Sequence, residues 1–480
     1  MHPADFAALL PFLILTATSV AVMLLISVTR SHLGTVALTM AGWTAAFLSL
    51  LIALRAVPRA VTPLLLVDRY ALFYIGLIIA AAAAVTLFSY DYFGKQEGRR
   101  EEFYVLLLVA TLGAAVLAAS SHFASFFLGL ETLSVPLFAM NAYLSDRKRP
   151  LEAGIKYLIL AAVSSAFLLF GMALIYTALG TMSFQRIASI LTAGGPVETP
   201  LVLSGAVMIL TGVGFKLSWV PFHLWTPDVY EGAPAPVTAF IATVSKGAVF
   251  SVLLRLFNSR ASDSSPIVQL LGFIALISMV AGTLLALLQN NVKRLLAYSS
   301  IAHMGFLLVA FLAAGKLAIE TVTFYWIVYF VSVLGAFGVV SLLSERDRDA
   351  DQLEDYRGLF WRRPLPAGIF AAMLLSLAGL PMTAGFMGKF YIVAAGAASA
   401  LWGLTLALII TSGIGIFYYL RLTMTLFAGL SEPQTAGPGF PAPSRLGNAL
   451  LIVLTILLIW LGVYPAPFIR MVQAFVVGIG

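Results

Sequence analysis

The chain is a succession of long apolar segments separated by short polar ones. Most segments reach the roughly 20 residues that a helix needs to cross a bilayer. None shows the ten-residue alternation of apolar and polar positions that membrane β-barrels have. The pattern therefore predicts an all-α polytopic membrane protein with about fourteen transmembrane helices. The segments run near residues 7–29, 33–54, 70–93, 103–120, 122–144, 151–179, 200–222, 234–258, 266–288, 295–314, 317–344, 365–396, 400–429 and 447–475.

Two of these segments, 200–222 and 365–396, are interrupted by glycine and proline. Such interruptions are typical of discontinuous helices, which membranes tolerate where the loosened backbone lines a polar cavity. Each of the two segments carries one lysine, Lys216 or Lys389, and this correspondence indicates an internal repeat. The interrupting residues are Gly212, Gly214 and Pro221 in the first segment, and Pro381, Gly385 and Gly388 in the second.

The composition supports a membrane protein and excludes several other classes. Hydrophobic residues make up 61% of the chain and charged residues 10%, whereas a soluble domain is about half apolar and a quarter charged. A soluble enzyme, a nucleic-acid binder and a disordered chain are therefore excluded, and the net charge of +7 is not a nucleic-acid footprint. The sequence has no cysteine, so thiolates cannot hold zinc or an iron–sulfur cluster. Since neither a basic region nor a cleavage site accompanies the first segment, we expect a retained helix, not a signal peptide.

Lysine and arginine are unevenly divided between the two sides that fourteen crossings would create. Sixteen of the 28 lie in or beside loops that follow odd-numbered segments, and eight lie on the other side. Because cytoplasmic loops are enriched in these residues, we expect the loops after odd-numbered segments in the cytoplasm and both termini on the outer side. The remaining four are within predicted spans, namely Lys156, Lys216, Lys246 and Lys389.

Two polar stretches are long enough to be separate features. Residues 345–363 hold eleven charges in nineteen positions. They fit either a solvated cytoplasmic connector or a docking surface for a partner protein. Residues 431–446 are rich in proline and glycine and predict a flexible connector before the last helix.

Charged residues inside apolar segments are the candidate chemistry, because a lone charge at the bilayer centre costs at least about 2.5–3.5 kcal/mol. Lys246 lies about 18 Å from each end of its segment, too deep for its side chain to reach the surface. Glu131 is also deep, and Lys216 suits it as a partner better than Lys156, which is nearer the loop. We expect functional roles for Glu131, Lys216, Lys246 and Lys389. For Glu131 the alternative is a carboxylate satisfied by neighbouring hydroxyl groups.

Three further residues are weaker candidates. Lys156 lies about 9 Å into its helix, so its amino group can instead extend to the surface. His303 is at mid-depth and could titrate near neutrality, although a buried packing role fits it equally well. Lys293 is at a helix start, where topology alone accounts for it. Burial disfavours a charged lysine and a nearby carboxylate favours it, so a movable carboxylate makes a lysine a switching proton site. These residues therefore predict a proton relay.

Three stretches resemble the antiporter-like membrane subunits of respiratory complex I, the bacterial NADH–quinone oxidoreductase. They are GFKLSWVPFHLWTPDVYEGAPAPVTAF, NNVKRLLAYSSIAHMGF and SLAGLPMTAGFMGKFYI. This family has three sibling subunits, and the segment WTPDVYEGAPAPV resembles one of them more than the other two. The resemblance covers essentially the whole chain, and motifs of this length are specific.

The resemblance implies two five-helix repeats of inverted topology, helices 4–8 and 9–13, with broken helices 7 and 12 and a half-channel in each repeat. It implies that Glu131, Lys216, Lys246 and Lys389 match the family's relay positions, and that Lys156 and Lys293 match further lysines. Helix 11 carries no counterpart of Lys156, so the halves need not work identically. Within a single membrane domain, 1–480, the implied parts are three N-terminal helices in 1–100, the first repeat in 101–260, the second in 261–430, and the connector and last helix in 431–480.

The resemblance also implies a division of labour in a larger assembly. This chain would hold no cofactor, while partner subunits would handle FMN, iron–sulfur clusters, NADH and quinone. Its expected partners are the other membrane-arm subunits, the lipid bilayer of the bacterial inner membrane and protons. The alternatives are a component of a multi-subunit cation/proton antiporter with the same fold, and a scaffold that only completes the membrane arm. Several buried lysines would be costly in a mere scaffold.

Overall fold

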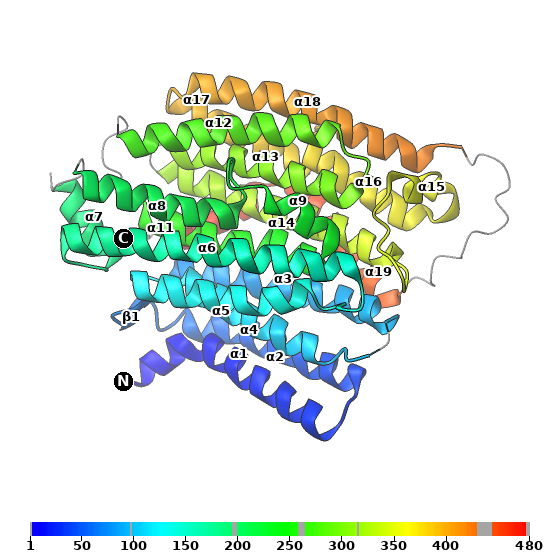
Figure 1. Cartoon of the computed structure of the whole chain (residues 1–480), viewed down its shortest axis with the longest axis horizontal. Coiled ribbons are helices and arrows are strands. Elements are labelled where there is room, and N and C mark those ends of the chain that lie inside the picture. The colour runs from blue at the N-terminus through cyan, green and yellow to red at the C-terminus, as the bar shows by residue number, and fades with distance from the viewer. Residues whose placement is uncertain are drawn as a thin grey trace.

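The computed structural model describes residues 2–96, 98–193, 199–257, 265–313, 316–429 and 444–476. These residues form a bundle of long helices lying side by side (Figure 1). Among them, twelve helices are long and apolar enough to cross a bilayer. Three shorter apolar helices accompany them, Glu102–Ala118, Pro364–Ala378 and Ala384–Ala398.

The N-terminal part and the first group of helices end at residue 256. Their elements are α1 (Pro3–Val28), α2 (His32–Ala53), β1 (Arg59–Thr62), β2 (Leu65–Val67), α3 (Arg69–Gly94), α4 (Glu102–Ala118), α5 (Phe123–Asn141), α6 (Lys148–Leu179), α7 (Phe184–Thr192), α8 (Pro200–Leu217), α9 (Trp225–Gly232), α10 (Ala235–Phe240), the π-helical turn η1 (Ile241–Ser245) and α11 (Lys246–Leu256).

The second group of helices begins at residue 266. Its elements are α12 (Pro266–Leu287), α13 (Val292–Leu312), α14 (Lys316–Leu343), the 3₁₀ turn η2 (Leu353–Tyr356), α15 (Leu359–Arg362), α16 (Pro364–Ala378), α17 (Ala384–Ala398), α18 (Trp402–Phe427), α19 (Arg445–Val463) and α20 (Ala466–Val476).

Local sequence explains where many helices begin and end. The side chains of Ser31, Asp68, Ser265 and Asn291 accept hydrogen bonds from the first turns of α2, α3, α12 and α13, which satisfies backbone N–H groups that a helix leaves free. Helix α6 ends at Gly180 in the left-handed conformation that glycine adopts without strain. Polar and glycine residues between the apolar segments therefore set these helix boundaries.

The helices differ in how much of their surface the rest of the chain covers. The segment from α10 to α11 and helix α14 are wholly buried over their most apolar 18 residues, and α13 is 94% buried. The corresponding windows of α1, α6, α18 and α19 are only 33% buried. The first set therefore forms the centre of the bundle, and polar groups on it are shielded from lipid.

Both predicted interruptions are present, but of the residues expected to cause them only Pro221 and Pro381 lie outside helices, while Gly212, Gly214, Gly385 and Gly388 lie inside α8 and α17. After α8, Ser218 adopts a left-handed conformation (φ 63°), and irregular backbone leads to α9. Between α16 and α17, Gly379 does the same (φ 82°). A third irregularity was not predicted. The π-helical turn η1 lies directly before Lys246, and such turns are frequent at functional positions.

Each of the fourteen predicted segments contains helix, and more than one helical element lies in each of 234–258, 365–396 and 447–475. The number of membrane crossings, the inverted repeats and the boundaries of the proposed parts stay predictions. Most of the predicted connector 431–446 lies outside the described residues, since the description resumes at Ser444.

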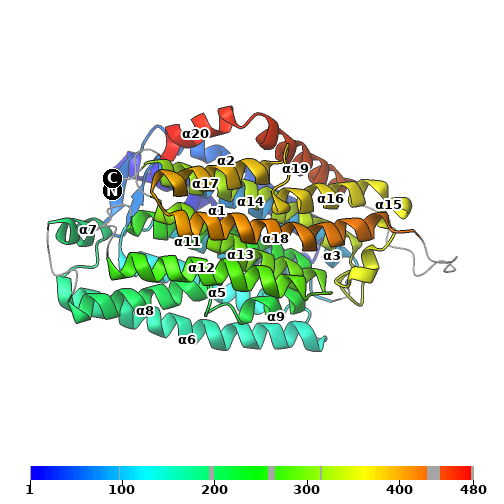
Figure 2. The ribbon, with the colours of Figure 1, turned by 90° about the horizontal axis from the view of Figure 1, so that it is seen from above.

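The chain ends lie at one end of the bundle, and residues 345–363, the charged loop, lie at the other. The N and C labels stand at one end together with the β1–β2 hairpin and α7, and α15 stands at the other (Figures 1 and 2). Termini at one end agree with an even number of crossings. The hairpin pairs antiparallel and contacts the α4–α5 turn, where Leu66 N donates to Ala119 O at 2.9 Å.

Candidate functional site

Lys216 is buried at the last turn of α8, with 2% of its surface exposed. Its Nζ donates to Ser134 Oγ on α5 at 2.7 Å and reaches Tyr157 Oη on α6 at 3.4 Å. The amino group also lies 5.0 Å from the centre of the Tyr157 ring. Three helices therefore converge on this lysine, and hydroxyl groups are its direct partners.

Glu131 lies on α5 one turn before Ser134, so both project from the same side of the helix. Its Oε1 accepts a hydrogen bond from Ser165 Oγ on α6 at 2.6 Å. Among the described residues Glu131 forms no ion pair, and it is half-buried. The sequence predicted Glu131 and Lys216 as partners. In the structure they lie near each other, but Ser165 donates to Glu131 and Ser134 accepts from Lys216, and the two residues make no direct contact.

Lys246, at the start of α11, is completely buried. Its Nζ donates to Ser300 Oγ on α13 at 2.7 Å, and Ser300 Oγ also receives a hydrogen bond from Tyr329 Oη on α14 at 2.7 Å. The Tyr230 ring lies 5.5 Å from the amino group. The central lysine is therefore joined by hydroxyl groups to the second group of helices.

Aromatic rings fill the space between Lys216 and Lys246. The ring of Trp225 lies 4.9 Å from that of Tyr157, which contacts Lys216, and 6.4 Å from that of Tyr230, which contacts Lys246. The three residues come from α6 and α9, so the interruption after α8 places α9 between the two lysines. Tyr157 and Tyr230 add hydroxyl groups to this apolar environment.

His303 lies one turn beyond Ser300 on α13 and is 3% exposed. Its Nδ1 is 2.6 Å from Tyr325 Oη and its Nε2 is 3.2 Å from Tyr419 Oη. Its ring is 5.5 Å from the ring of Tyr329, the partner of Ser300. Both ring nitrogens therefore have hydroxyl partners, and either can carry the proton.

Lys389 lies in the second turn of α17 and is 8% exposed. Its Nζ donates to Ala378 O, the last carbonyl of α16, and to Ser412 Oγ on α18, both at 2.8 Å. The Phe306 ring stands 5.4 Å from Nζ and 5.4 Å from the His303 ring. The broken helix thus supplies a backbone carbonyl to this lysine, which an uninterrupted helix would use internally.

Lys156 belongs to a different environment. Its side chain is 42% exposed and pairs with Glu152 at 2.6 Å and Asp228 at 3.0 Å. Together with Arg149, Glu231 and Arg294, these residues line a polar cavity of about 220 Å³ near the end of the bundle that carries the charged loop. The sequence allowed the Lys156 amino group to extend to the surface, and in the structure it does so.

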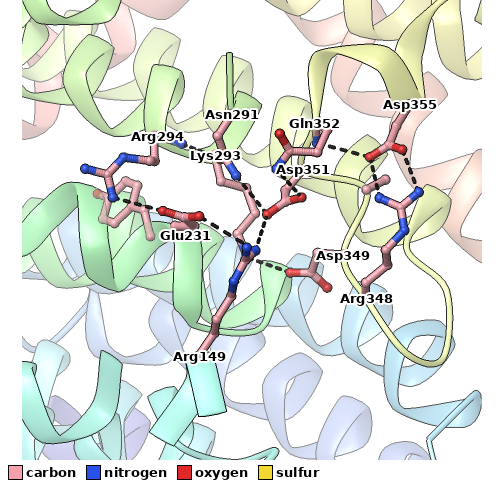
Figure 3. A network of polar contacts seen from close by, with 12 residues as sticks. Arg149, Glu231, Asn291, Lys293, Arg294, Arg348, Asp349, Asp351, Gln352 and Asp355 are labelled. Carbon is pink, nitrogen blue, oxygen red and sulfur yellow. Dashed lines mark hydrogen bonds and ion pairs between the residues drawn. The ribbon is translucent and has the colours of Figure 1, made fainter. Parts of the chain in front are cut away.

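Lys293 is completely buried and paired, which its place at a helix start did not foretell. Its Nζ lies 2.5 Å from Asp349 Oδ2 and donates to Ala233 O at 2.7 Å. Asp349 also accepts a hydrogen bond from Tyr92 Oη at 2.6 Å. Figure 3 shows Lys293 and Asp349 within a larger network that joins the charged loop to α9 and α13.

The rest of the 345–363 loop is also held by its own chain. Asp351 accepts from Asn291 Nδ2 at 2.8 Å and lies 3.4 Å from Arg149 (Figure 3). Tyr356 is buried and donates to Ala350 O at 2.7 Å, and burial raises the pKa of its hydroxyl well above the usual value, so it stays a donor. Asp351 and Tyr356 are therefore held by other parts of the chain, whereas Asp347, Glu354 and Trp361 are exposed. Both interpretations of the loop, as a connector and as a docking surface, stay predictions.

Sequence reasoning missed the hydroxyl groups that join the lysines. The signal was available in the spacing, since Ser299, Ser300 and His303 share α13, and Tyr325 and Tyr329 are four residues apart on α14, which places them on one helix face. Metal ligation has no comparable support, because the described residues contain no group of three or more histidine, aspartate or glutamate side chains that could hold an ion.

The bundle, its two broken helices and the row of buried amino, imidazole and hydroxyl groups define an antiporter-like polytopic membrane protein. Residues 120–415 match the family described as NADH:quinone oxidoreductase/Mrp antiporter, TM. The chain is 50% identical to NADH-quinone oxidoreductase subunit N of Ectopseudomonas mendocina (strain ymp), covering 98% of both sequences. The chain therefore belongs to the NADH-quinone oxidoreductase subunit N family, and the resemblance drawn from its motifs is confirmed.

Solved structures agree with this assignment. A chain of respiratory complex I from Thermus thermophilus with bound aureothin is 35% identical, with a TM-score of 0.82 and coverage of 96% of this chain and 98% of that one. Two others share the fold alone. They are chains of the archaeal membrane-bound sulfane sulfur reductase (24% identity, TM-score 0.86, coverage 99% and 98%) and of the Mrp complex from Dietzia sp. DQ12-45-1b (17%, 0.84, 99% and 97%).

Proposed function

We propose that this chain is a proton-translocating, non-redox subunit in the membrane arm of a bacterial NADH–quinone oxidoreductase. The observation that carries the proposal is the row of buried groups from Lys216 through Lys246 and His303 to Lys389. Each of them bonds to a hydroxyl group or a carbonyl, and aromatic rings connect neighbouring members. Groups of this kind at membrane depth are typical of proton pathways.

In the first group of helices, proton uptake and release by Lys216 depend on its distance from Glu131. Burial disfavours a charged lysine, and an approaching carboxylate favours it. When Glu131 is held by Ser165, Lys216 can release its proton toward Lys246. When the carboxylate approaches, Lys216 can take up another. Movement of one carboxylate therefore alternates the lysine between two charge states.

The redox groups of the assembly belong to partner subunits in this proposal. A chain without cysteine offers no thiolates for iron–sulfur clusters, and NADH, FMN and quinone are assigned elsewhere in the complex. The proposed location is the bacterial inner membrane, with both termini on the periplasmic side, as the bias of lysine and arginine supports. The partners are other membrane-arm subunits and the lipid around them.

The experiment that tests this function is purification of the chain from detergent-solubilised native membranes. On a native gel it should co-migrate with NADH dehydrogenase activity. Co-migration with the subunits of a cation/proton antiporter, without that activity, would favour the alternative function. A scaffold role would be favoured if the assembled complex pumped protons normally after Lys246 had been replaced.

A further inference from the structure

A buried ion pair that the relay does not use joins the start of α3 to the end of α11. Arg255 donates from Nη1 to Asp68 Oδ2 at 2.9 Å and from Nη2 to Asp68 Oδ1 at 2.8 Å. Both side chains are only 6% exposed. Because removing two charges from water is expensive, apolar residues of similar size often replace such a pair without loss of stability. Stabilisation alone is therefore a weak reason for its presence.

The pair lies where several elements meet at the end of the bundle that carries the termini. Asp68 follows the β1–β2 hairpin and caps α3 by accepting from Ala71 N at 2.7 Å. Arg255 also reaches Ala118 O, at the end of α4, at 3.3 Å. Lys246 begins α11 and Arg255 lies in its last turn, about 14 Å away along the axis. The pair therefore stands between the central lysine and this end of the protein.

Polar groups continue from the pair into the core. The Tyr70 ring lies 5.0 Å from the Arg255 guanidinium, and Tyr70 Oη donates to Ser251 O at 2.8 Å. The Tyr74 ring is 4.8 Å from Tyr70, and its Oη is 3.2 Å from Thr323 Oγ1 on α14. If nothing blocked proton movement at the ion pair, such polar groups would offer protons a route between the relay and the surface.

We propose that Arg255, held by Asp68, is an electrostatic barrier that stops protons of the central relay from leaking to the side of the membrane where the termini lie. A guanidinium cannot be deprotonated in a protein, and a fixed arginine excludes protons from other membrane pores. The bidentate contact fixes its orientation. The hydrogen bond from Ala71 N to Asp68 also fixes the carboxylate, and with it the guanidinium, at the start of α3.

The test measures passive proton leakage in sealed membrane vesicles that contain the whole complex. Without NADH, a pH step is imposed and its decay is followed with a pH-sensitive dye. Arg255→Gln should speed the decay several-fold. The paired change Asp68→Leu with Arg255→Met leaves no unpaired charge, so it should assemble and still leak. Because no NADH is used, this measurement is separate from the pumping assays that test the proposed function on which the barrier rests.

Arg59→Gln provides the matched control, because Arg59 pairs with Asp5 at the same end of the bundle but is more exposed. It should leave the decay unchanged. Decay at the unaltered rate in the assembled Asp68→Leu/Arg255→Met complex would overturn the barrier and leave the pair as a structural contact. Failure of that paired variant to assemble would also overturn it, since the charges would then be needed for folding.

Discussion

Lys246 Nζ on α11 and Ser300 Oγ on α13 are joined by a hydrogen bond of 2.7 Å between residues 54 positions apart. This contact links the helix that ends the first group to the centre of the second. Ser300 in turn receives the Tyr329 hydroxyl, and His303 lies one turn away on α13. The proposed relay therefore passes through a single buried amino group at the boundary between the two groups of helices.

Lys246→Met should abolish most NADH-driven proton pumping. Methionine fills a similar apolar volume, so assembly should be preserved, while the proton-carrying group is lost. A positioned acid–base group typically contributes 10²–10⁴-fold to rate, and we expect a loss of at least about tenfold in the initial rate of acidification. The measurement is dye quenching in inverted vesicles. Lys148→Met, at an exposed lysine, is the control and should pump normally.

Glu131→Gln and Lys216→Ala should each sharply reduce pumping, and the double variant should be little worse than either. Removing one member stops the other from alternating between charge states, and residues that act as a unit give non-additive losses. Pumping and NADH–quinone electron transfer should fall together, since the two are coupled in the proposed function. Strictly additive losses would show that the two residues work separately. Full pumping in an assembled Lys216→Ala complex would contradict the proposal that Glu131 alternates the charge state of Lys216.

Gly379→Ala should impair pumping by displacing Lys389. A Cβ at Gly379 would stand 2.8 Å from Lys389 Cδ and 3.1 Å from its Nζ, and the backbone there has φ 82°. The left-handed conformation alone costs a non-glycine residue about 1–2 kcal/mol. Gly368→Ala, within the α16 helix that Gly379 follows, should leave vesicle acidification unchanged, because no atom lies within 4 Å of the added Cβ. Equal pumping in the two variants would contradict this positioning role.

Asp349→Asn should lower the amount of assembled complex. Lys293 would then keep a buried charge without its carboxylate, and breaking one side of such a pair typically costs about 3–5 kcal/mol. Asp347→Asn removes an exposed carboxylate from the same loop and should assemble normally on a native gel. If the two variants assemble equally, the Lys293–Asp349 contact does not hold the loop.

A C-terminal tag should be accessible from the periplasmic side only. The prediction rests on the bias of lysine and arginine toward the end of the bundle opposite the termini. Labelling with a membrane-impermeant reagent should occur in right-side-out vesicles and not in sealed inverted ones. Preferential labelling of the inverted vesicles would reverse the topology.

The sequence by itself determined the class of the protein and most of its helices. Apolar segments of membrane length leave a helix as the simplest way to satisfy the backbone in lipid, so element type followed directly from hydropathy. Proline marked both interruptions, since Pro221 and Pro381 lie in the non-helical stretches that follow α8 and α16. The glycines were poorer guides, because Gly212, Gly214, Gly385 and Gly388 lie inside helices. The burial of Lys246 was also predicted, since 1.5 Å per residue converts its position in the segment into a distance from either end, and the side chain is completely buried.

Only the tertiary structure decided which groups meet. Depth along a helix says nothing about rotation around it or about the neighbouring helix, so Ser134, Ser300 and Tyr329 could not be assigned to their lysines. The same limit hid the Asp349 partner of Lys293 and the Asp68 partner of Arg255, which lie far away in the chain. Hydropathy sets what a segment is in a membrane, whereas side-chain partners depend on packing between helices, a relation that no single segment contains.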